Sequence, residues 1–202
     1  HRFDSQITPV TVKGRKGDTV ITADEHPRPD TTPADLGKLP PVFRKGGTVS
    51  AGNSSGITDG AASMLVVAES VIQERGWKPQ AWLGPSATVG VDPSIMGIGP
   101  VPAVRDVLAQ SQRTLDAYDA IELNEAFAAQ VIACDRDLHF DRNKLNVNGG
   151  SIALGHPIGC TGARIVTTLL HEMERRSARL GLATLCVSGG LGLALELDRN
   201  GI

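Results

Sequence analysis

The sequence predicts an α/β fold in which helices cover the faces of a layered sheet. Apolar runs of strand length alternate with helical patterns, which is typical of layered α/β domains. Two apolar runs near the end of the chain, 182–187 and 191–197, flank a short glycine turn and predict a β-hairpin. Glycine-rich segments also follow predicted strands, and open α/β sheets place their binding sites at such positions.

Composition and charge exclude several classes of protein. The chain has 202 residues, of which 41% are hydrophobic and 21% charged, as in a folded globular protein and unlike a disordered one. The formal net charge is −2 and only 3% of the residues are aromatic, which argues against binding of nucleic acid. No apolar run approaches the length of about 20 residues that spans a bilayer, and no signal-peptide pattern is visible.

The cysteines indicate a reducing environment. Cys134, Cys160 and Cys186 are an odd number and lack the CxxC spacing of zinc sites. We therefore expect free thiols, no metal centre and a cytoplasmic location.

Residues 1 to about 50 are predicted to form a peripheral region that packs on something larger. Two short β-branched runs, 7–12 and 19–22, flank a turn with two glycines and are expected to pair as strands. Residues 61–68 are small and apolar, which predicts a buried strand. A polar helix is expected to follow this strand and to end near Gly76.

The later part of the chain is predicted to alternate strands and helices in a layered α/β domain. Strands are expected at 81–89 and 119–123 and in the hairpin, and helices are expected to begin near Pro102, at Glu125 and at Gly162. The third helix, 162–176, has the clearest pattern. One side of it is apolar and the opposite side charged: Ile165, Val166, Leu169, Leu170 and Met173 against Glu172, Glu174 and Arg175.

The first segment of interest is Asn124-Glu125-Ala126-Phe127, which directly follows a predicted strand. Asparagine is among the best residues for capping a helix N-terminus, so Asn124 is either a cap or a site residue at a strand end. A cap residue can also serve a site, and the sequence leaves both interpretations open.

The second segment is a glycine-rich loop, 146–160, that leads into the strongest helix. Its glycines allow the backbone to approach a ligand closely. His156 lies between Gly155 and Pro157, so the proline restricts its backbone. Such a histidine is either structural or an acid–base catalyst.

The third segment is Cys186 with the turn Ser188-Gly189-Gly190, whose backbone N–H groups can point at an anion. Cys186 is either a small core residue or a reactive thiol. Neither a P-loop nor a GxGxxG fingerprint occurs, which disfavours nucleotide hydrolysis and NAD chemistry.

Together, these segments resemble the C-terminal half of a thiolase in their order and motifs: Asn-Glu-Ala-Phe, Asn-x-Asn-Gly-Gly with Gly-His-Pro, and Cys-x-x-Gly-Gly-x-Gly. Residues 51–62 are similar to the family's CoA-contacting segment, and residues 11–30 to its loop domain. The resemblance covers essentially the whole chain. It implies a layered α/β/α/β/α fold of two similar halves. This chain would supply the loop domain and the last strand and helix of the N-terminal half (residues 1–76) and the complete C-terminal domain (residues 77–202).

The resemblance also implies an activity and a set of catalytic groups. Thiolases make or break the carbon–carbon bond of a 3-ketoacyl-CoA through an acyl-enzyme on a cysteine, and that cysteine belongs to the N-terminal half, outside this chain. His156 would activate it. Cys186 would exchange a proton with the acetyl methyl group, and Asn124 would hold a water that forms an oxyanion hole with His156. The turn at Ser188 and Gly189 would supply a backbone N–H to a second oxyanion hole.

For the substrate, the resemblance assigns Ser55 to the pantetheine arm of CoA and Arg28 to its nucleotide end. Met96 and Phe127 either line the acyl pocket or are ordinary core residues. Apart from CoA and acyl-CoA as substrate and product, no cofactor is implied. The implied protein partners are the N-terminal thiolase half and further copies in a homodimer or homotetramer.

The sequence departs from the family pattern at one turn, and two other functions are alternatives. Many thiolases carry three glycines where this chain has Ser188-Gly189-Gly190, a change that preserves the backbone N–H. A thiolase-like protein that binds acyl-CoA or lipid without turnover is the main alternative, but it would not need Asn124, His156 and Cys186 together. A ketoacyl synthase is disfavoured because those enzymes use two histidines with their cysteine.

Overall fold

A four-stranded sheet organises the C-terminal part of the chain in the computed structural model, which describes residues 2–201. Its strand order is β3 (Trp82–Gly90), β6 (Leu191–Asp198), β5 (Leu180–Val187) and β4 (Ala120–Leu123). β3 pairs antiparallel with β6 and β6 with β5, whereas β4 and β5 are parallel. A parallel pair requires a crossover, and the helices between β4 and β5 provide it.

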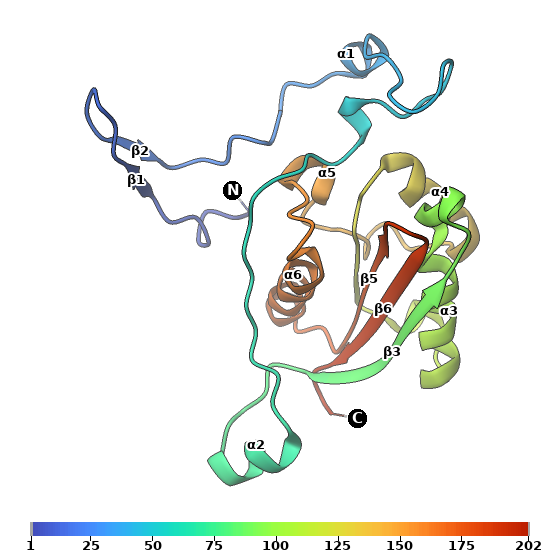
Figure 1. Cartoon of the computed structure of the whole chain (residues 1–202). Helices are drawn as coiled ribbons and strands as arrows, with labels where there is room; N and C mark the ends of the chain where they lie inside the picture. Colours follow the sequence, from blue (N-terminus) through green and yellow to red (C-terminus); the bar gives the residue numbers. More distant parts are fainter. Residues whose placement is uncertain (1, 202) are drawn as a thin grey trace.

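Helices cover both faces of this sheet (Figure 1). α6 (Thr161–Arg176) packs on β4 and β5, while α3 (Pro100–Ser111) packs on the opposite face against β3 and β6. α4 (Ala128–Leu138) lies beside α3, and the short α5 (Ser151–Leu154) precedes α6. The predicted α/β class is therefore confirmed.

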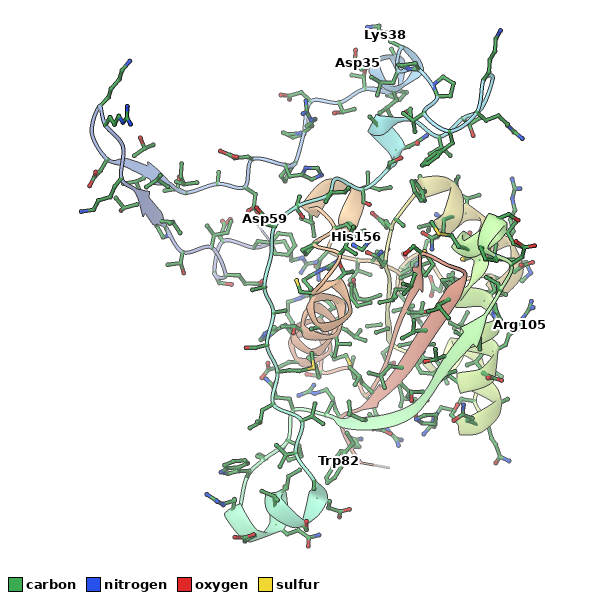
Figure 2. The ribbon with its side chains drawn as sticks, viewed as in Figure 1. Asp35, Lys38, Asp59, Trp82, Arg105 and His156 are labelled. Carbon is green, nitrogen blue, oxygen red and sulfur yellow. The ribbon has the colours of Figure 1, made fainter. Side chains whose placement is uncertain are left out.

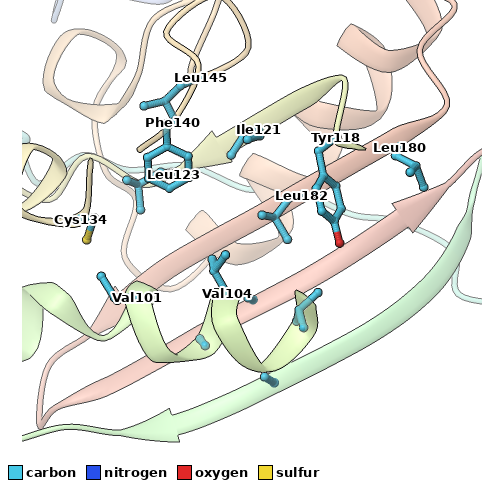
Figure 3. Close-up of a cluster of buried hydrophobic side chains, with 14 residues drawn as sticks. Val101, Val104, Tyr118, Ile121, Leu123, Cys134, Phe140, Leu145, Leu180 and Leu182 are labelled. Atoms are coloured by element: carbon cyan, nitrogen blue, oxygen red, sulfur yellow. The ribbon is translucent and has the colours of Figure 1, made fainter. Parts of the chain in front are cut away.

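Each face of the sheet has its own hydrophobic core. Because neighbouring side chains of a strand point to opposite faces, Leu182 of β5 packs on the α3 side with Val104 and Tyr118 (Figure 3). Ala183 packs on the α6 side with Leu169. Among residues 2–201, no helix is both long enough and apolar enough to cross a bilayer.

The N-terminal region, residues 2–76, extends away from this body (Figure 1). β1 (Val10–Val12) and β2 (Thr19–Ile21) form the predicted antiparallel pair. α1 (Pro33–Gly37) follows, and α2 (Glu69–Arg75) ends at Gly76 in the left-handed conformation, as predicted.

The buried strand predicted at 61–68 is wrong. These residues form no regular element, and the side chains of Leu65 and Val66 are 77% and 67% exposed. A strand needs a neighbouring strand to satisfy its backbone, and no strand within residues 2–201 pairs with this segment. The segment is apolar as a buried strand would be, but an apolar composition alone does not provide a second strand to pair with.

The predicted charged side of α6 is also partly wrong, because Glu172 is only 3% exposed. Its carboxylate accepts hydrogen bonds from Asn148 Nδ2 (2.8 Å) and from Arg175 Nε (2.9 Å), and it pairs with Arg176. Burial favours the neutral acid, but these partners dominate and lower the pKa of Glu172 to about 2. The carboxylate therefore ties α6 to the glycine-rich loop.

We expect Glu172→Gln to reduce the free energy of unfolding at pH 7 by roughly 3 kcal/mol, at about 1.4 kcal/mol per unit of pKa shift. A lowered folded-state pKa stabilises the protein above the unfolded pKa of about 4.5, and this contribution is lost as the pH falls toward about 2. Urea unfolding at a series of pH values measures the difference between the two proteins. Exposed Glu174→Gln is the matched control, and an equal loss in both variants would contradict the prediction.

Candidate active site

The predicted segments meet at the end of the sheet where β5 leads into the hairpin turn. Asn124 follows β4 directly, and its backbone N–H donates to Thr184 O of β5 (3.0 Å). Cys186 lies two residues further along β5. His156 lies near the same end of the sheet (Figure 2), in the loop that leads to α6.

Asn124 is a buried amide with one half of its hydrogen-bonding capacity unused. Its side chain is 2% exposed, and its Oδ1 accepts a hydrogen bond from the Ser151 hydroxyl (2.6 Å). Its Nδ2 has no hydrogen-bond partner among the described residues. The residue that caps α4 is Phe127, in extended conformation, so the helix begins three residues later than predicted and Asn124 is not its cap. A buried donor of this kind is suited to an oxygen of a ligand or of water.

Glu125 fastens this strand end to the glycine-rich loop. Its carboxylate accepts hydrogen bonds from the backbone N–H of Ile152 (3.2 Å) and from Asn146 Nδ2 (3.3 Å). A Cβ at Gly150 would lie 2.2 Å from the carboxyl carbon of Glu125, so a larger residue there would displace this carboxylate from its hydrogen bonds. The loop's glycines thus serve internal packing as well as access for a ligand.

His156 is held at both its backbone and its ring. Its backbone N–H donates to Gly56 O (2.8 Å), and its Nδ1 lies 2.6 Å from Thr161 Oγ1. The Thr161 hydroxyl donates its proton to Pro157 O (3.0 Å), so its oxygen accepts from Nδ1–H. This assignment leaves a lone pair on Nε2. Burial and, secondarily, the charge of Arg164 lower the pKa of His156, which favours this neutral, basic form.

Cys186 is a buried thiol next to a tight glycine turn. It is 7% exposed, and burial raises its pKa, so the protonated thiol predominates near neutral pH. The turn has the predicted hairpin form, in which Gly189 and Gly190 adopt φ angles of 88° and 89°. A Cβ at Gly190 would lie 2.2 Å from Val91 O, so no larger residue fits there. Ser188 and Gly189 are exposed.

The segment with Ser55 lies against residues 124–127, which follow β4. The backbone N–H and the hydroxyl of Ser55 both donate to Ala126 O, at 3.0 and 3.2 Å. Its neighbour Ser54 forms a β-bridge with Phe127. The ring of Phe127 makes an edge-to-face contact with Phe43, with centroids 5.4 Å apart. The structure therefore brings Ser55 and Phe127 close to the site.

Met96 and Arg28 lie in different surroundings. Met96 is half-buried in a 3₁₀ helix, Pro93–Ile98, that packs against α4 and β5. Arg28 is exposed in the N-terminal region. His26, two residues before Arg28, contacts the glycine-rich loop: its Nε2 lies 3.2 Å from Ile152 O. A groove is lined on one side by residues 58–62 of the N-terminal region and on the other by residues 157–160 of the glycine-rich loop.

Sequence reasoning missed three polar residues that hold the site: Ser151, Thr161 and Arg164. Arg164 Nη2 donates to Ser151 Oγ (3.1 Å), which in turn contacts Asn124. One signal was available for Arg164. It lies in the first turns of α6, where the helix dipole disfavours a positive charge, so a specific partner was to be expected.

Comparisons with known proteins agree with this arrangement. A family model described as thiolase, C-terminal domain, matches residues 77–199, and one described as thiolase, N-terminal domain, matches residues 1–70. An acetyl-CoA acetyltransferase of Syntrophomonas wolfei is 54% identical over 98% of this chain and 50% of its own length. A mitochondrial 3-ketoacyl-CoA thiolase of Bos taurus is 45% identical over 98% of this chain and 50% of its own length.

Solved structures give the same result. The crystal structure of the Bacillus anthracis acetyl-CoA acetyltransferase superposes with a TM-score of 0.89 at 49% identity, covering 97% of this chain and 50% of that one. Human mitochondrial 3-ketoacyl-CoA thiolase in complex with CoA has a TM-score of 0.82 at 44% identity, covering 89% and 46%. The chain thus spans about half the length of the relatives it matches. On its sequence and its fold alike, the chain belongs to the thiolase family.

Proposed function

We propose that this chain is the CoA-binding and acid–base part of a thiolase, which acts on 3-ketoacyl-CoA together with a nucleophilic cysteine outside the chain. The observation that carries the proposal is the hydrogen-bonded state of His156. Thr161 Oγ1 accepts a hydrogen bond from Nδ1–H, which keeps the proton on Nδ1 and leaves Nε2 as a base, at the same end of the sheet as Asn124 and Cys186 (Figure 2).

In the thiolysis direction, His156 Nε2 takes the proton of the nucleophilic thiol, because an ordinary thiol is mostly protonated at neutral pH. The thiolate attacks the 3-keto carbonyl carbon, and the bond between C2 and C3 breaks. The acyl group stays on the cysteine, and acetyl-CoA leaves as its enolate. Asn124, through a water, and His156 stabilise the negative charge that develops on the thioester oxygen.

Cys186 then gives its proton to C2 of the enolate, a step for which its raised pKa keeps the proton available. Cys186 regains a proton from the His156 imidazolium, and the neutral His156 then takes the thiol proton of an incoming CoA. The CoA sulfur attacks the acyl-enzyme, the shortened acyl-CoA leaves, and the released cysteine takes this proton back from His156. A backbone N–H from the turn at Ser188 and Gly189 contributes to the oxyanion hole of this acyl transfer. Reversal of these steps is the Claisen condensation of two acetyl-CoA.

For CoA we propose that the pantetheine arm passes Ser55 and that Arg28 meets the nucleotide end. Ser55 lies beside residues 124–127, and the exposed Arg28 is free to move toward a phosphate or an adenine ring. Phe127 and Met96 would line the acyl pocket, which makes the chain-length preference depend on their size.

The assembly is part of the same proposal. We propose a division at residues 76 and 77, a cytoplasmic location, an N-terminal thiolase half as partner and a homodimer or homotetramer as the working state. The exposed apolar residues Met64, Leu65 and Val66 support a partner that covers them.

The test uses what we call the assembled enzyme: this chain joined to an N-terminal thiolase half that carries the nucleophilic cysteine. Acetoacetyl-CoA and CoA are supplied, and acetyl-CoA is measured. We expect acetyl-CoA from the assembled enzyme, and none after Cys→Ala at the nucleophile or from this chain alone. Binding of acetoacetyl-CoA without any acetyl-CoA formation would overturn the proposal in favour of a binding protein without turnover.

A further inference from the structure

Arg164 takes no part in the acid–base steps. Its guanidinium nevertheless donates a hydrogen bond to Ser151, whose hydroxyl binds Asn124. We propose that Arg164 is a positioning residue that acts through the Ser151 hydroxyl to hold the Asn124 amide with its Nδ2 toward the reacting atoms. The inference rests on the proposed function, because it assigns a purpose to the orientation of Asn124.

A directed chain of hydrogen bonds connects the three residues. Arg164 Nη2 donates to Ser151 Oγ over 3.1 Å, and its Nη1 donates to Thr168 Oγ1 over 3.4 Å, which braces the guanidinium along α6. Ser151, the first residue of α5, is fully buried, and its hydroxyl donates to Asn124 Oδ1 over 2.6 Å. Asn124 Nδ2, at the end of this series of hydrogen bonds, has no partner among the described residues.

The direction of this chain follows from the first donor. A guanidinium can only donate hydrogen bonds, so Ser151 Oγ accepts from Arg164 and its own proton is left for Asn124. If the Asn124 amide were turned over, the Ser151 proton would face an N–H group, and Oδ1 would occupy the position of Nδ2. Two buried polar atoms would then lack partners in place of one. Arg164 thus selects the orientation in which Asn124 offers a donor to the site.

Charge explains why a cation remains at this position. Burial lowers the pKa of Arg164. Its position near the N-terminal end of α6 also disfavours a positive charge. The carboxyls of Glu122 and Glu125 act in the opposite direction. Burial raises the pKa of Glu122 to about 8, so Glu122 is itself mostly neutral near pH 7. Arg164 in turn lowers the pKa of His156, which gives its removal a second measurable effect.

The experiment compares Ser151→Ala, Arg164→Met and Arg164→Lys in the assembled enzyme. We expect Ser151→Ala and Arg164→Met to lower kcat about 10-fold to 100-fold, with little change in the KM for CoA, because a misdirected donor weakens an oxyanion hole. The acidic limb of the kcat/KM profile should move to higher pH in Arg164→Met and stay in place in Ser151→Ala. Arg164→Lys keeps the charge and one donor, so we expect it to keep the limb and to recover part of kcat.

Matched controls come from α3 on the opposite face of the sheet. Arg105→Met removes a guanidinium that lies far from His156 (Figure 2), and Ser111→Ala removes a hydroxyl at the end of the same helix. We expect both variants to leave kcat and the pH profile unchanged. A merely structural role would lower the melting temperature and kcat together, and the KM for CoA would change with them. That result, or wild-type kcat in both Ser151→Ala and Arg164→Met, would overturn the inference.

A second readout separates this inference from the proposed function. The side-chain amide NMR signals of Asn124, observed in this chain and assigned with Asn124→Asp, should shift in Ser151→Ala and Arg164→Met but not in Arg105→Met. An inactive assembled enzyme with shifted amide signals would overturn the proposed function and leave the hydrogen-bond chain intact. An active enzyme with unshifted signals would overturn the positioning role of Arg164.

Discussion

Replacement of His156 by asparagine is expected to lower the rate of thiolysis by the assembled enzyme about 10³-fold, while the affinity for CoA stays within about 2-fold. The loss has the size expected for a general base, because the nucleophilic thiol then keeps its proton. His156 contacts Thr161 and the backbone of Gly56 but is not assigned to CoA. Steady-state thiolysis of acetoacetyl-CoA and calorimetric titration with CoA measure the two quantities.

The same prediction has a pH component with a definite sign. Burial and the charge of Arg164 lower the pKa of His156 from its usual 6.5. The basic form therefore persists below pH 6.5, and the acidic limb of kcat/KM should fall below that pH. The control is His171→Asn, an exposed histidine on α6. Equal losses of turnover and CoA affinity in His156→Asn, or a similar loss of turnover in the control, would refute the assignment of His156 as the base.

Replacement of Cys186 by alanine is expected to separate two reactions that share the acyl-enzyme. Thiolysis of acetoacetyl-CoA should fall about 10²-fold to 10³-fold, because the enolate loses its proton donor. The exchange of the acetyl group between acetyl-CoA and labelled CoA involves no carbon–carbon bond and should fall less than about 5-fold. The ratio of the two rates, measured in the same preparation, reports the role of Cys186 independently of the folded fraction.

Cys134→Ala is the matched control for this ratio. Cys134 is fully buried in the core on the α3 side, where its Sγ lies 3.4 Å from Gly97 O and burial raises its pKa to about 12. We expect its removal to lower stability, through the cavity it leaves, and to keep the ratio of the two rates. A similar fall of exchange and thiolysis in Cys186→Ala would show that Cys186 is a structural residue.

The elements that follow from local pattern were predicted correctly. The apolar stripe of α6 and the glycine turn between β5 and β6 are fixed by residues close in sequence, and the structure has both. The helical end at Gly76 belongs to the same class, since glycine adopts its left-handed conformation without strain. Such features depend on propensity and periodicity alone.

The features that were missed depend on residues far apart in the chain. Residues 61–68 have the composition of a strand, but a strand exists only where another strand pairs with it. Glu172 is charged and was placed on the solvent side, yet Asn148, from the glycine-rich loop, covers it. Likewise, the contact of Ser151 with Asn124 spans 27 positions and has no local signal.

The candidate site shows the same division. The motifs located Asn124, His156 and Cys186, whereas the orientation of each group comes from partners that no motif includes. Thr161 sets the tautomer of His156, and burial sets the protonation of Cys186. The residue types were thus predictable from the sequence, but their chemical states required the structure.

The central claim is that this chain supplies the acid–base groups while the acyl group is carried by a cysteine outside it. Incubation of the assembled enzyme with acetyl-CoA, followed by acid quench, proteolysis and mass spectrometry of the peptides, locates the acetyl thioester directly. The account predicts the acetyl group on the nucleophilic cysteine of the N-terminal half, and none on Cys134, Cys160 or Cys186. An acetyl thioester on any of these three cysteines would contradict it.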